Sequence, residues 1–133
     1  MLELYCLNMN NFLSKKDIGD KGEKSAVKFL RKKGYKILAK NYRIKQAEVD
    51  IIAWKRQGLE KVICFIEVKT RKFDDGSAER AVDLKKIQHI MSGARNFCKE
   101  KCINIETTLI SFEHISVFTE EENKINHFVI PID

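Results

Sequence analysis

The sequence has few cysteines and no long apolar run. Its four cysteines (Cys6, Cys64, Cys98 and Cys102) have neither the spacing of a disulfide framework nor that of a zinc ribbon. Cys98 and Cys102 lie four residues apart on an expected helix and could share a metal. Without a histidine nearby, we expect ordinary half-buried thiols instead. The sequence shows no secretory leader either, so we expect a cytoplasmic protein with no membrane partner.

Repeats, low-complexity tracts and linkers are also missing. With 133 residues, 44% of them hydrophobic, the chain can bury one ordinary core. We expect a loosely ordered arm over residues 1–16, which show no sustained period, and a single domain over residues 17–133. The 25 Lys and Arg against 19 Asp and Glu leave a formal net charge of +6. That excess favours a polyanionic partner such as nucleic acid, although a merely basic protein would show the same count.

The apolar periodicity predicts two helices and five strands. One helical pattern runs from Asp20 to a stop signal at Gly34, and a second runs from about Asp83, a plausible N-cap, to Lys101. Three β-like runs lie between the helices and two more close the chain, over residues 35–44, 48–55, 61–71, 107–118 and 125–132. The predicted order is therefore α-β-β-β-α-β-β, in the α/β class.

The third β-like run ends with charged residues. Period-two alternation puts Phe65, Glu67 and Lys69 on one face of the strand, and both faces upstream are apolar. If Gly58 and Leu59 form a two-residue hairpin loop, Asp50 stands across from Glu67. A shift of one residue in that turn would send Asp50 to the opposite face.

Two carboxylates in such a position repel each other, and burying them is unfavourable by several kcal/mol unless a cation neutralises them. Mg²⁺ commonly binds one or two carboxylates together with phosphate oxygens and water, so Asp50 and Glu67 are candidate ligands for Mg²⁺ or Mn²⁺. Lys69 could then hold a phosphate oxygen or orient the attacking water. The alternative is a plain ion pair between Glu67 and Lys69 at the end of a strand.

The first predicted helix carries a third acid and a basic stripe. Glu23 shares the inward stripe of the helix and could join the metal ligands, although favourable charge in the first helical turn explains it about as well. Basic residues occupy another stripe, which is either a solvated face or a phosphate-binding surface: Lys24, Lys28 and Arg31.

Four blocks of the sequence carry a resemblance to a known family. These are "GEKSAVKFLRKKGYKILAKNYR", "AEVDIIA", "FIEVKTR" and "AVDLKKIQHI". Together they resemble the YraN-type family of bacterial proteins, which is related to restriction endonucleases and archaeal Holliday junction resolvases, within the PD-(D/E)xK superfamily. The resemblance runs from about Gly22 to Lys101. It departs at Val49, where the superfamily often has proline, and at Ala47, where the family usually has glycine.

The resemblance implies a restriction-endonuclease-like core, in which a central mixed sheet is flanked by helices. It also implies a catalytic group of Glu23, Asp50, Glu67 and Lys69 around a divalent metal. Lys86 matches a basic position that reaches toward the site or the substrate in such folds.

We therefore expect a metal-dependent endonuclease that hydrolyses DNA phosphodiester bonds, with branched or junction DNA as one candidate substrate and a homodimer as an open alternative to a monomer. Arg71, Lys72 and Lys85 or Lys86 would contact the nucleic-acid backbone without reading sequence. Two other classes stay open. One is a catalytically silent nucleic-acid-binding module acting with repair or recombination partners, and the other is a purely structural protein.

Overall fold

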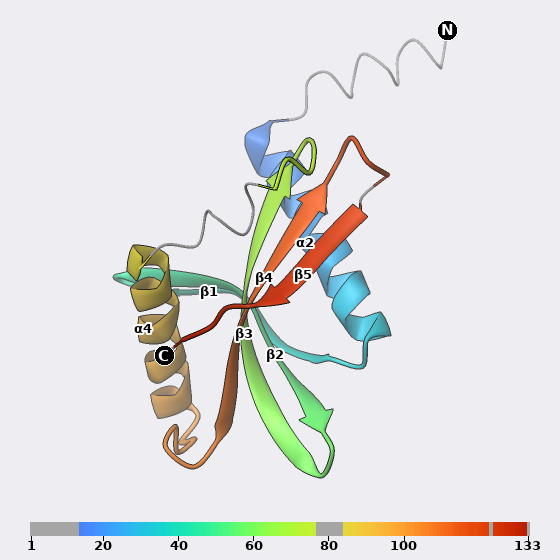
Figure 1. Ribbon diagram of the computed structural model, residues 1–133. Coiled ribbons are helices and arrows are strands. Elements are labelled where there is room, and N and C mark those ends of the chain that lie inside the picture. Colours follow the sequence, from blue (N-terminus) through green and yellow to red (C-terminus); the bar gives the residue numbers. More distant parts are fainter. Residues whose placement is uncertain (1–13, 77–83, 123, 133) are drawn as a thin grey trace, which may run out of the picture.

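The computed structural model describes residues 14–76, 84–122 and 124–132. The elements follow the predicted order: α2 (Lys15–Lys32), β1 (Lys36–Ile44), β2 (Ala47–Gln57), β3 (Glu60–Arg71), α4 (Leu84–Glu100), β4 (Leu109–Phe118) and β5 (Lys124–Val129). The five strands form one sheet in the order β1-β2-β3-β4-β5, with α2 and α4 on opposite sides of it (Figure 1).

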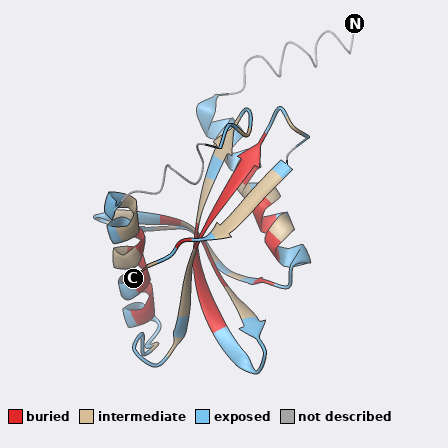
Figure 2. Ribbon diagram, in the orientation of Figure 1, coloured by how far each residue is buried: buried red, intermediate tan, exposed pale blue. Residues whose placement is uncertain are grey.

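The sheet is mixed, as expected. The strands β1, β2 and β3 form an antiparallel meander, β3 and β4 pair in parallel, and β5 pairs antiparallel with β4. The parallel pair requires a crossover connection, and α4 supplies it. The strand β3 therefore has neighbours on both sides, and its residues 62–66 are buried (Figure 2).

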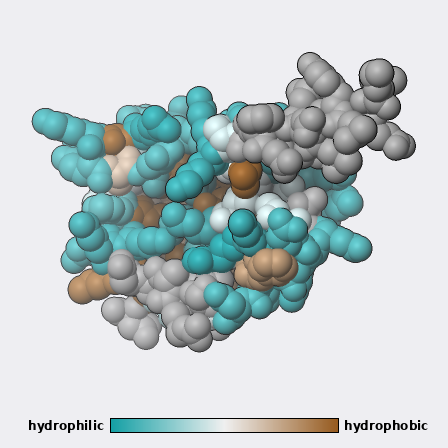
Figure 3. All heavy atoms as spheres, turned by 90° about the horizontal axis from the view of Figure 1, so that it is seen from above, coloured by the Kyte–Doolittle hydropathy of each residue, from teal (hydrophilic) through white to brown (hydrophobic). Residues whose placement is uncertain are grey.

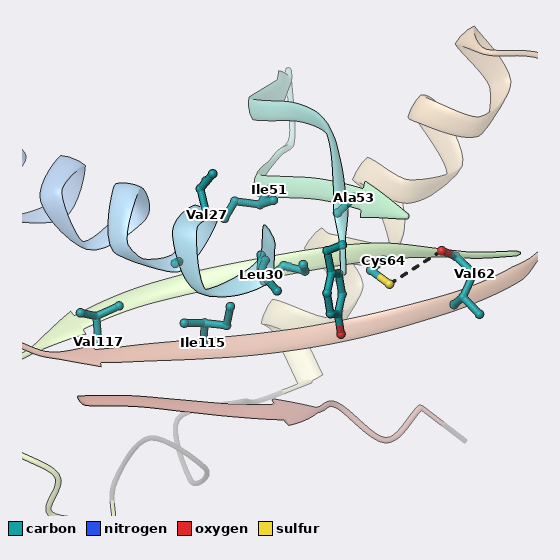
Figure 4. Packing of buried hydrophobic residues seen from close by; sticks show 11 residues of the cluster. Val27, Leu30, Ile51, Ala53, Val62, Cys64, Ile115 and Val117 are labelled. Atoms are coloured by element: carbon teal, nitrogen blue, oxygen red, sulfur yellow. Dashed lines mark hydrogen bonds between the residues drawn. The ribbon is translucent and has the colours of Figure 1, made fainter. Parts of the chain in front are cut away.

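Both faces of β3 are covered, which explains its run of apolar residues. Val62, Cys64 and Ile66 pack in the cluster beneath α2, whereas Ile63 and Phe65 pack in the cluster beneath α4. Figure 4 shows the α2-side cluster, where residues of the helix meet those of β2, β3 and β4. The outer surface is mostly hydrophilic in the view of Figure 3, with apolar residues visible only in small areas. The alternation predicted for β3 is confirmed.

The predicted hairpin loop is also confirmed. Gln57 and Glu60 are the last paired residues, so Gly58 and Leu59 form the loop between β2 and β3. Gly58 has a φ of 63°, a conformation that glycine adopts without steric cost, and Leu59 is 97% exposed. The resulting register places Trp54 opposite Ile63 and Ile52 opposite Phe65.

The start of the first helix differs from the prediction. The helix α2 begins at Lys15 rather than Asp20, because Ser14 and Asp17 form a capping box. The polar first turn has no apolar period, which is why the pattern became readable only later. Residues 15 and 16 thus belong to the helix, while residues 1–13 of the predicted arm lie outside the described residues, as does the predicted N-cap Asp83.

Two glycines let the helices approach the sheet next to the end of the β2–β3 hairpin. A Cβ atom on Gly22 of α2 would overlap the Thr70 hydroxyl of β3. A Cβ atom on Gly93 of α4 would lie 2.6 Å from Cγ2 of Val49 in β2, so Val49 fills the space that Gly93 leaves. Both helices are therefore in tight contact with the sheet beside the residues predicted to form the site.

Candidate active site

A cavity of about 330 Å³ opens where β2 and β3 separate. Three of the four residues predicted to be catalytic line it: Asp50, Glu67 and Lys69. Its other wall is the first turns of α4, which contribute Lys86, His89 and Ile90. The structure thus brings together two acids and a lysine from adjacent strands, and adds a second lysine from the helix beyond.

The strand β2 is irregular at Asp50. Val49 packs in the α4-side cluster and Ile51 in the α2-side cluster, although residues two apart in a regular strand share a face. On β1 the ladder skips Asn41, between the pairs Lys40–Ile51 and Tyr42–Val49, and Asn41 has a left-handed φ of 51°. At this irregularity the buried side chains of β2 change from one face of the sheet to the other, and Asp50 is the residue between them.

The predicted pair of Asp50 and Glu67 is therefore not a regular ladder pair. The ladder between β2 and β3 ends one step earlier, at Ile51 and Ile66. Beyond that step the Val68 backbone N–H donates to Oδ2 of Asp50 at 2.7 Å. The Asp50 carboxylate thus takes the place of a backbone carbonyl as the acceptor for Val68. This hydrogen bond fixes Asp50 at the mouth of the hairpin, the end where β2 and β3 separate.

Burial raises the pKa of Asp50 to about 6. The hydrogen bond from Val68 opposes the shift, while the nearby carboxylates of Glu23, Glu67 and Glu48 add to it. Asp50 therefore lies in a region of concentrated negative charge that a cation would stabilise.

Glu67 has one charged partner and one buried histidine as a neighbour. Its Oε1 lies 3.3 Å from Nζ of Lys86, and its Oε2 lies 4.0 Å from Nδ1 of His114. The ion-pair partner is thus Lys86 of the helix rather than Lys69 of the same strand. Lys69 is exposed at the cavity wall, so its ammonium is accessible to a ligand.

Glu23 lies beside this group but not in the same cavity. It lines a larger hollow of about 790 Å³ between α2 and β1, which also contains Lys24, Lys28 and Arg31. With its nitrogen turned toward Glu23, the Asn41 amide donates to both carboxylate oxygens, at 3.1 and 3.2 Å. Burial raises the pKa of Glu23, against this hydrogen bond. Glu23 influences Asp50 through charge, and the structure separates it from the cavity lined by Asp50 and Glu67.

The remaining residues predicted to contact nucleic acid surround the same end of the sheet. Lys72 is exposed, and its carbonyl oxygen accepts from the Glu120 N–H at 3.0 Å. Arg71 is partly buried, with its carbonyl oxygen accepting from Thr119 N–H at 2.8 Å. Lys85 is exposed at the start of α4, next to Lys86.

Three residues of the site escaped the sequence analysis: Glu48, His89 and His114. Glu48 and His89 line the cavity. Lys86 and His89 are three residues apart on a helix and so share a face, which was a readable signal. His114 is fully buried, and burial lowers its pKa to about 4, so it is neutral near pH 7. It pairs with Glu67 only through the parallel β3–β4 register, for which no local signal exists in the sequence.

A divalent metal fits two of the three predicted ligands. Asp50 and Glu67 offer carboxylate oxygens to one cavity, and Mg²⁺ commonly takes one or two carboxylates with water and phosphate oxygens. Within the residues that the structure describes, no group of three or more His, Cys, Asp and Glu is arranged to hold a metal ion. The protein alone thus supplies part of a coordination shell.

Comparison with known proteins defines the class and then the family. The structure is that of an α/β protein with a five-stranded mixed sheet, which carries acidic residues where β2 is irregular. The profile of the uncharacterised protein family UPF0102 matches its residues 22–117. The chain belongs to this family. That match includes all four sequence blocks given above.

Individual relatives cover most of both chains. A UPF0102 protein of Clostridioides difficile is 42% identical over 124 residues, which is 91% of this chain and 97% of that protein. A UPF0102 protein of Flavobacterium psychrophilum is 40% identical over 114 residues, covering 84% and 90%. A third, from Caldicellulosiruptor saccharolyticus, is 34% identical over 114 residues, covering 85% and 92%. The names of these relatives do not state an activity. None of the helices in the described part of the chain is long and apolar enough to cross a membrane.

Proposed function

We propose that the protein is a metal-dependent nuclease that hydrolyses phosphodiester bonds of DNA, on a restriction-endonuclease-like core. The observation that carries this proposal is the cavity shared by Asp50, Glu67 and Lys69, where the two antiparallel strands separate. The mixed sheet between two helices and the element order also support it.

Asp50 and Glu67 would hold the metal, Mg²⁺ or Mn²⁺. Such an ion supplies a Lewis acid that makes water more acidic and offsets the charge that grows on the phosphate. The Val68 N–H donates to Asp50, and the Lys86 ammonium lies 3.3 Å from Glu67, so each carboxylate already has a fixed polar neighbour. Lys86 must share Glu67 with the cation, and its position lets it move to a phosphate oxygen of the substrate.

Lys69 would act on the reacting groups rather than on the metal. A protonated ammonium has three donors and no lone pair, so it can orient the attacking water or hold a phosphate oxygen, but it cannot ligate a cation. Its exposed position at the cavity wall is compatible with either contact. The positive charge would also stabilise the transition state electrostatically.

The second candidate function is a nucleic-acid-binding module without catalysis. It is favoured by the net charge of +6, and by the finding that the described residues contain no group of three or more His, Cys, Asp and Glu arranged to hold a metal ion. Its contacts would be the same basic residues, acting on phosphates alone.

A cleavage screen separates the two candidates. Linear, flapped and branched DNAs are incubated with Mg²⁺, with Mn²⁺ or with EDTA, and Glu67→Ala is compared with Glu60→Ala. Glu60 is a matched control because it is an exposed glutamate at the other end of β3. We expect metal-dependent products with the unmodified chain and with Glu60→Ala, and none with Glu67→Ala. Binding without products on all these DNAs would favour the binding module.

A further inference from the structure

The larger hollow between α2 and β1 is strongly cationic along most of its length. Its volume is about 790 Å³, and its lining includes five basic residues: Lys24, Lys28, Arg31, Lys32 and Lys40. Four of them come from one side of α2, at spacings of three, four and eight residues that keep them on one stripe of the helix. The fifth faces them from β1, so positive charge occupies both walls.

The strand wall of this hollow is unsuited to binding another strand. β1 is an edge strand of the sheet. Its pairing with β2 is irregular between Ile37 and Ala39, and Asn41 has a left-handed φ. Irregular backbone and lysines on an edge strand oppose the addition of a further strand. The occupant of the hollow is therefore recognised by its charge rather than by strand pairing.

The hollow has two chemically different ends. Lys28, Arg31 and Lys32 mark one end, whereas Asp20 and Glu23 mark the other. The acidic end is close to the candidate active site, since Gly22, next to Glu23, packs against Thr70, next to Lys69 of the cavity. A phosphate chain held by the cations would thus run toward Asp50, where a divalent cation is needed to accept the next phosphate.

We propose that this hollow binds a single strand of nucleic acid, two to four nucleotides long, next to the phosphate that is cleaved. Its basic part, from Lys24 to Lys32, is roughly 12 Å long at 1.5 Å per helical residue. That length spans roughly three to four phosphates at the duplex spacing of about 3.4 Å per nucleotide, and fewer in a more extended single strand. A volume of about 790 Å³ is the size of a small-ligand pocket, which matches a short segment of one strand better than the wider duplex.

This inference rests on the proposed function and narrows its substrate to DNA with a single-stranded segment beside the cleavage point. None of the described residues that line the hollow is aromatic, so base stacking adds nothing there. Binding in the hollow should therefore be insensitive to base sequence and steeply dependent on salt.

The test compares two double variants of α2. Lys28→Gln/Arg31→Gln removes two cations of the hollow, and Lys16→Gln/Lys21→Gln removes two exposed cations of the same helix that do not line it. Each lowers the formal charge of +6 by two. Fluorescence anisotropy of the full chain in EDTA measures the affinity for a labelled duplex with a six-nucleotide thymidine overhang and for the blunt duplex, over a salt series.

We expect Lys28→Gln/Arg31→Gln to weaken binding of the overhang and to reduce the log–log salt slope by about 1.4, from two lost single-strand contacts at about 0.7 each. Lys16→Gln/Lys21→Gln should leave the slope within error of the unmodified chain. Equal losses in both variants, or an equal loss for the blunt duplex, would overturn the inference. So would an affinity for poly-glutamate that depends equally on the hollow, which would indicate an acidic protein segment as the occupant.

A failure of the proposed function can be distinguished from a failure of this inference. The binding assay contains no metal and no cleavage, so a single-strand-specific loss in the hollow variant supports the inference even if the unmodified chain cleaves nothing. Conversely, a chain that cleaves DNA but binds the overhang equally well after Lys28→Gln/Arg31→Gln retains the proposed function and loses the single-strand site. Lys40→Gln, on the opposite wall, gives a second variant with the same expected direction.

Discussion

Asp50 is a carboxyl group that the fold holds at an energetic disadvantage. Its pKa of about 6 in the folded chain lies above the ordinary value of 3.8. The folded state therefore binds more protons than the unfolded chain between these values, and stability falls as pH rises from about 4 to about 6. A neutral residue that keeps the hydrogen bond from Val68 should relieve this cost.

Asp50→Asn should accordingly raise the free energy of unfolding at pH 8, by on the order of 1–3 kcal/mol, in the absence of metal. The gain should shrink toward zero below pH 4, where Asp50 is protonated in both states. Urea unfolding in EDTA at the two pH values measures the difference, with Glu60→Gln as the exposed control. An Asp50→Asn variant that is equally or less stable at pH 8 would contradict the burial of a charged Asp50.

Lys69 and Asp50 should have separable roles. Lys69→Ala should lower the single-turnover cleavage rate by about 10²–10³ while leaving Mn²⁺ affinity unchanged, because the ammonium contributes electrostatic stabilisation but no ligand. Asp50→Ala should abolish both. Calorimetric Mn²⁺ titration beside a single-turnover assay decides this. If Lys69→Ala retains full metal-dependent activity, Lys69 is only a counter-ion.

At the scale of elements, α2 and α4 reach the sheet through Gly22 and Gly93. Gly22→Ala and Gly93→Ala should each lower the free energy of unfolding by about 1–3 kcal/mol, because the new methyl groups overlap Thr70 and Val49. Gly19→Ala is the matched control. It lies on the same helix as Gly22 with open space around its Cβ, and it should be stabilising by about 0.5–1 kcal/mol.

Denaturant unfolding of the three variants at one pH checks this prediction. Because Val49 precedes Asp50 and Thr70 follows Lys69, displaced helices should also weaken Mn²⁺ binding in the two destabilised variants. Equal stability of Gly19→Ala and Gly22→Ala would show that α2 does not pack as closely as described.

A second polar group joins the turn between α2 and β1 to the far edge of the sheet. Glu113 of β4 is fully buried, and its Oε1 accepts from the Tyr35 hydroxyl at 2.7 Å and lies 2.6 Å from Nε2 of His127 in β5. The Lys55 ammonium donates in turn to the Tyr35 hydroxyl at 3.0 Å. Despite burial, which opposes it, the hydrogen bonds from His127, Cys64 and Tyr35 lower the pKa of Glu113 to about 2.

Glu113→Gln should therefore lower the free energy of unfolding at pH 7, by about 2–4 kcal/mol, because a buried hydrogen-bonded charge is replaced and its partners are left in place. The pH dependence of this contribution to stability is opposite in sign to that of Asp50. The stability due to Glu113 is present above its unfolded pKa near 4.5 and is lost as pH falls toward 2. Thermal melts from pH 3 to pH 7 measure it, and a constant difference across that range would contradict the charged form.

Local patterns predicted the hairpin register but not its break. A two-residue loop and period-two alternation involve neighbours in sequence, so Gly58 and Leu59 sufficed to place Ile52 opposite Phe65. The turning point at Asp50 depends on the left-handed Asn41 of another strand and on Gly93 of α4. Those contacts are tertiary, and no periodicity in β2 reports them.

The candidate active site likewise combines residues that local patterns predicted with residues that only tertiary contacts bring there. Asp50, Glu67 and Lys69 were readable because they stand at the ends of two strands joined by a short loop. Glu23 was placed with them from its inward stripe, but a helix stripe defines a direction and not a distance, and the structure puts Glu23 in the neighbouring hollow. His114 required the parallel pairing of β3 with β4, which are separated by α4 in sequence.

For the whole molecule, the cation and the fold should stabilise each other. Asp50 and Glu67 come from different strands, so the site exists only in the folded chain, and a cation that binds only this state raises its stability by RT ln(1 + [M]/Kd). Loaded to 100 times its Kd, Mn²⁺ should add about 2.7 kcal/mol. For a chain of 133 residues this corresponds to a rise in Tm of roughly 10 °C.

Thermal melts over a Mn²⁺ series, with EDTA as baseline, test this without any substrate. Asp50→Ala should abolish the rise in Tm, whereas Lys69→Ala and Glu60→Ala should keep it, because neither removes a ligand. The Glu23→Gln variant tests whether Glu23 belongs to the metal site. If Glu23 acts on Asp50 only through charge, this variant should reduce the Mn²⁺-induced rise in Tm but not abolish it. A complete loss in Glu23→Gln would instead make Glu23 a third ligand, and an equal Mn²⁺ effect in Asp50→Ala would move the metal away from the mouth of the hairpin altogether.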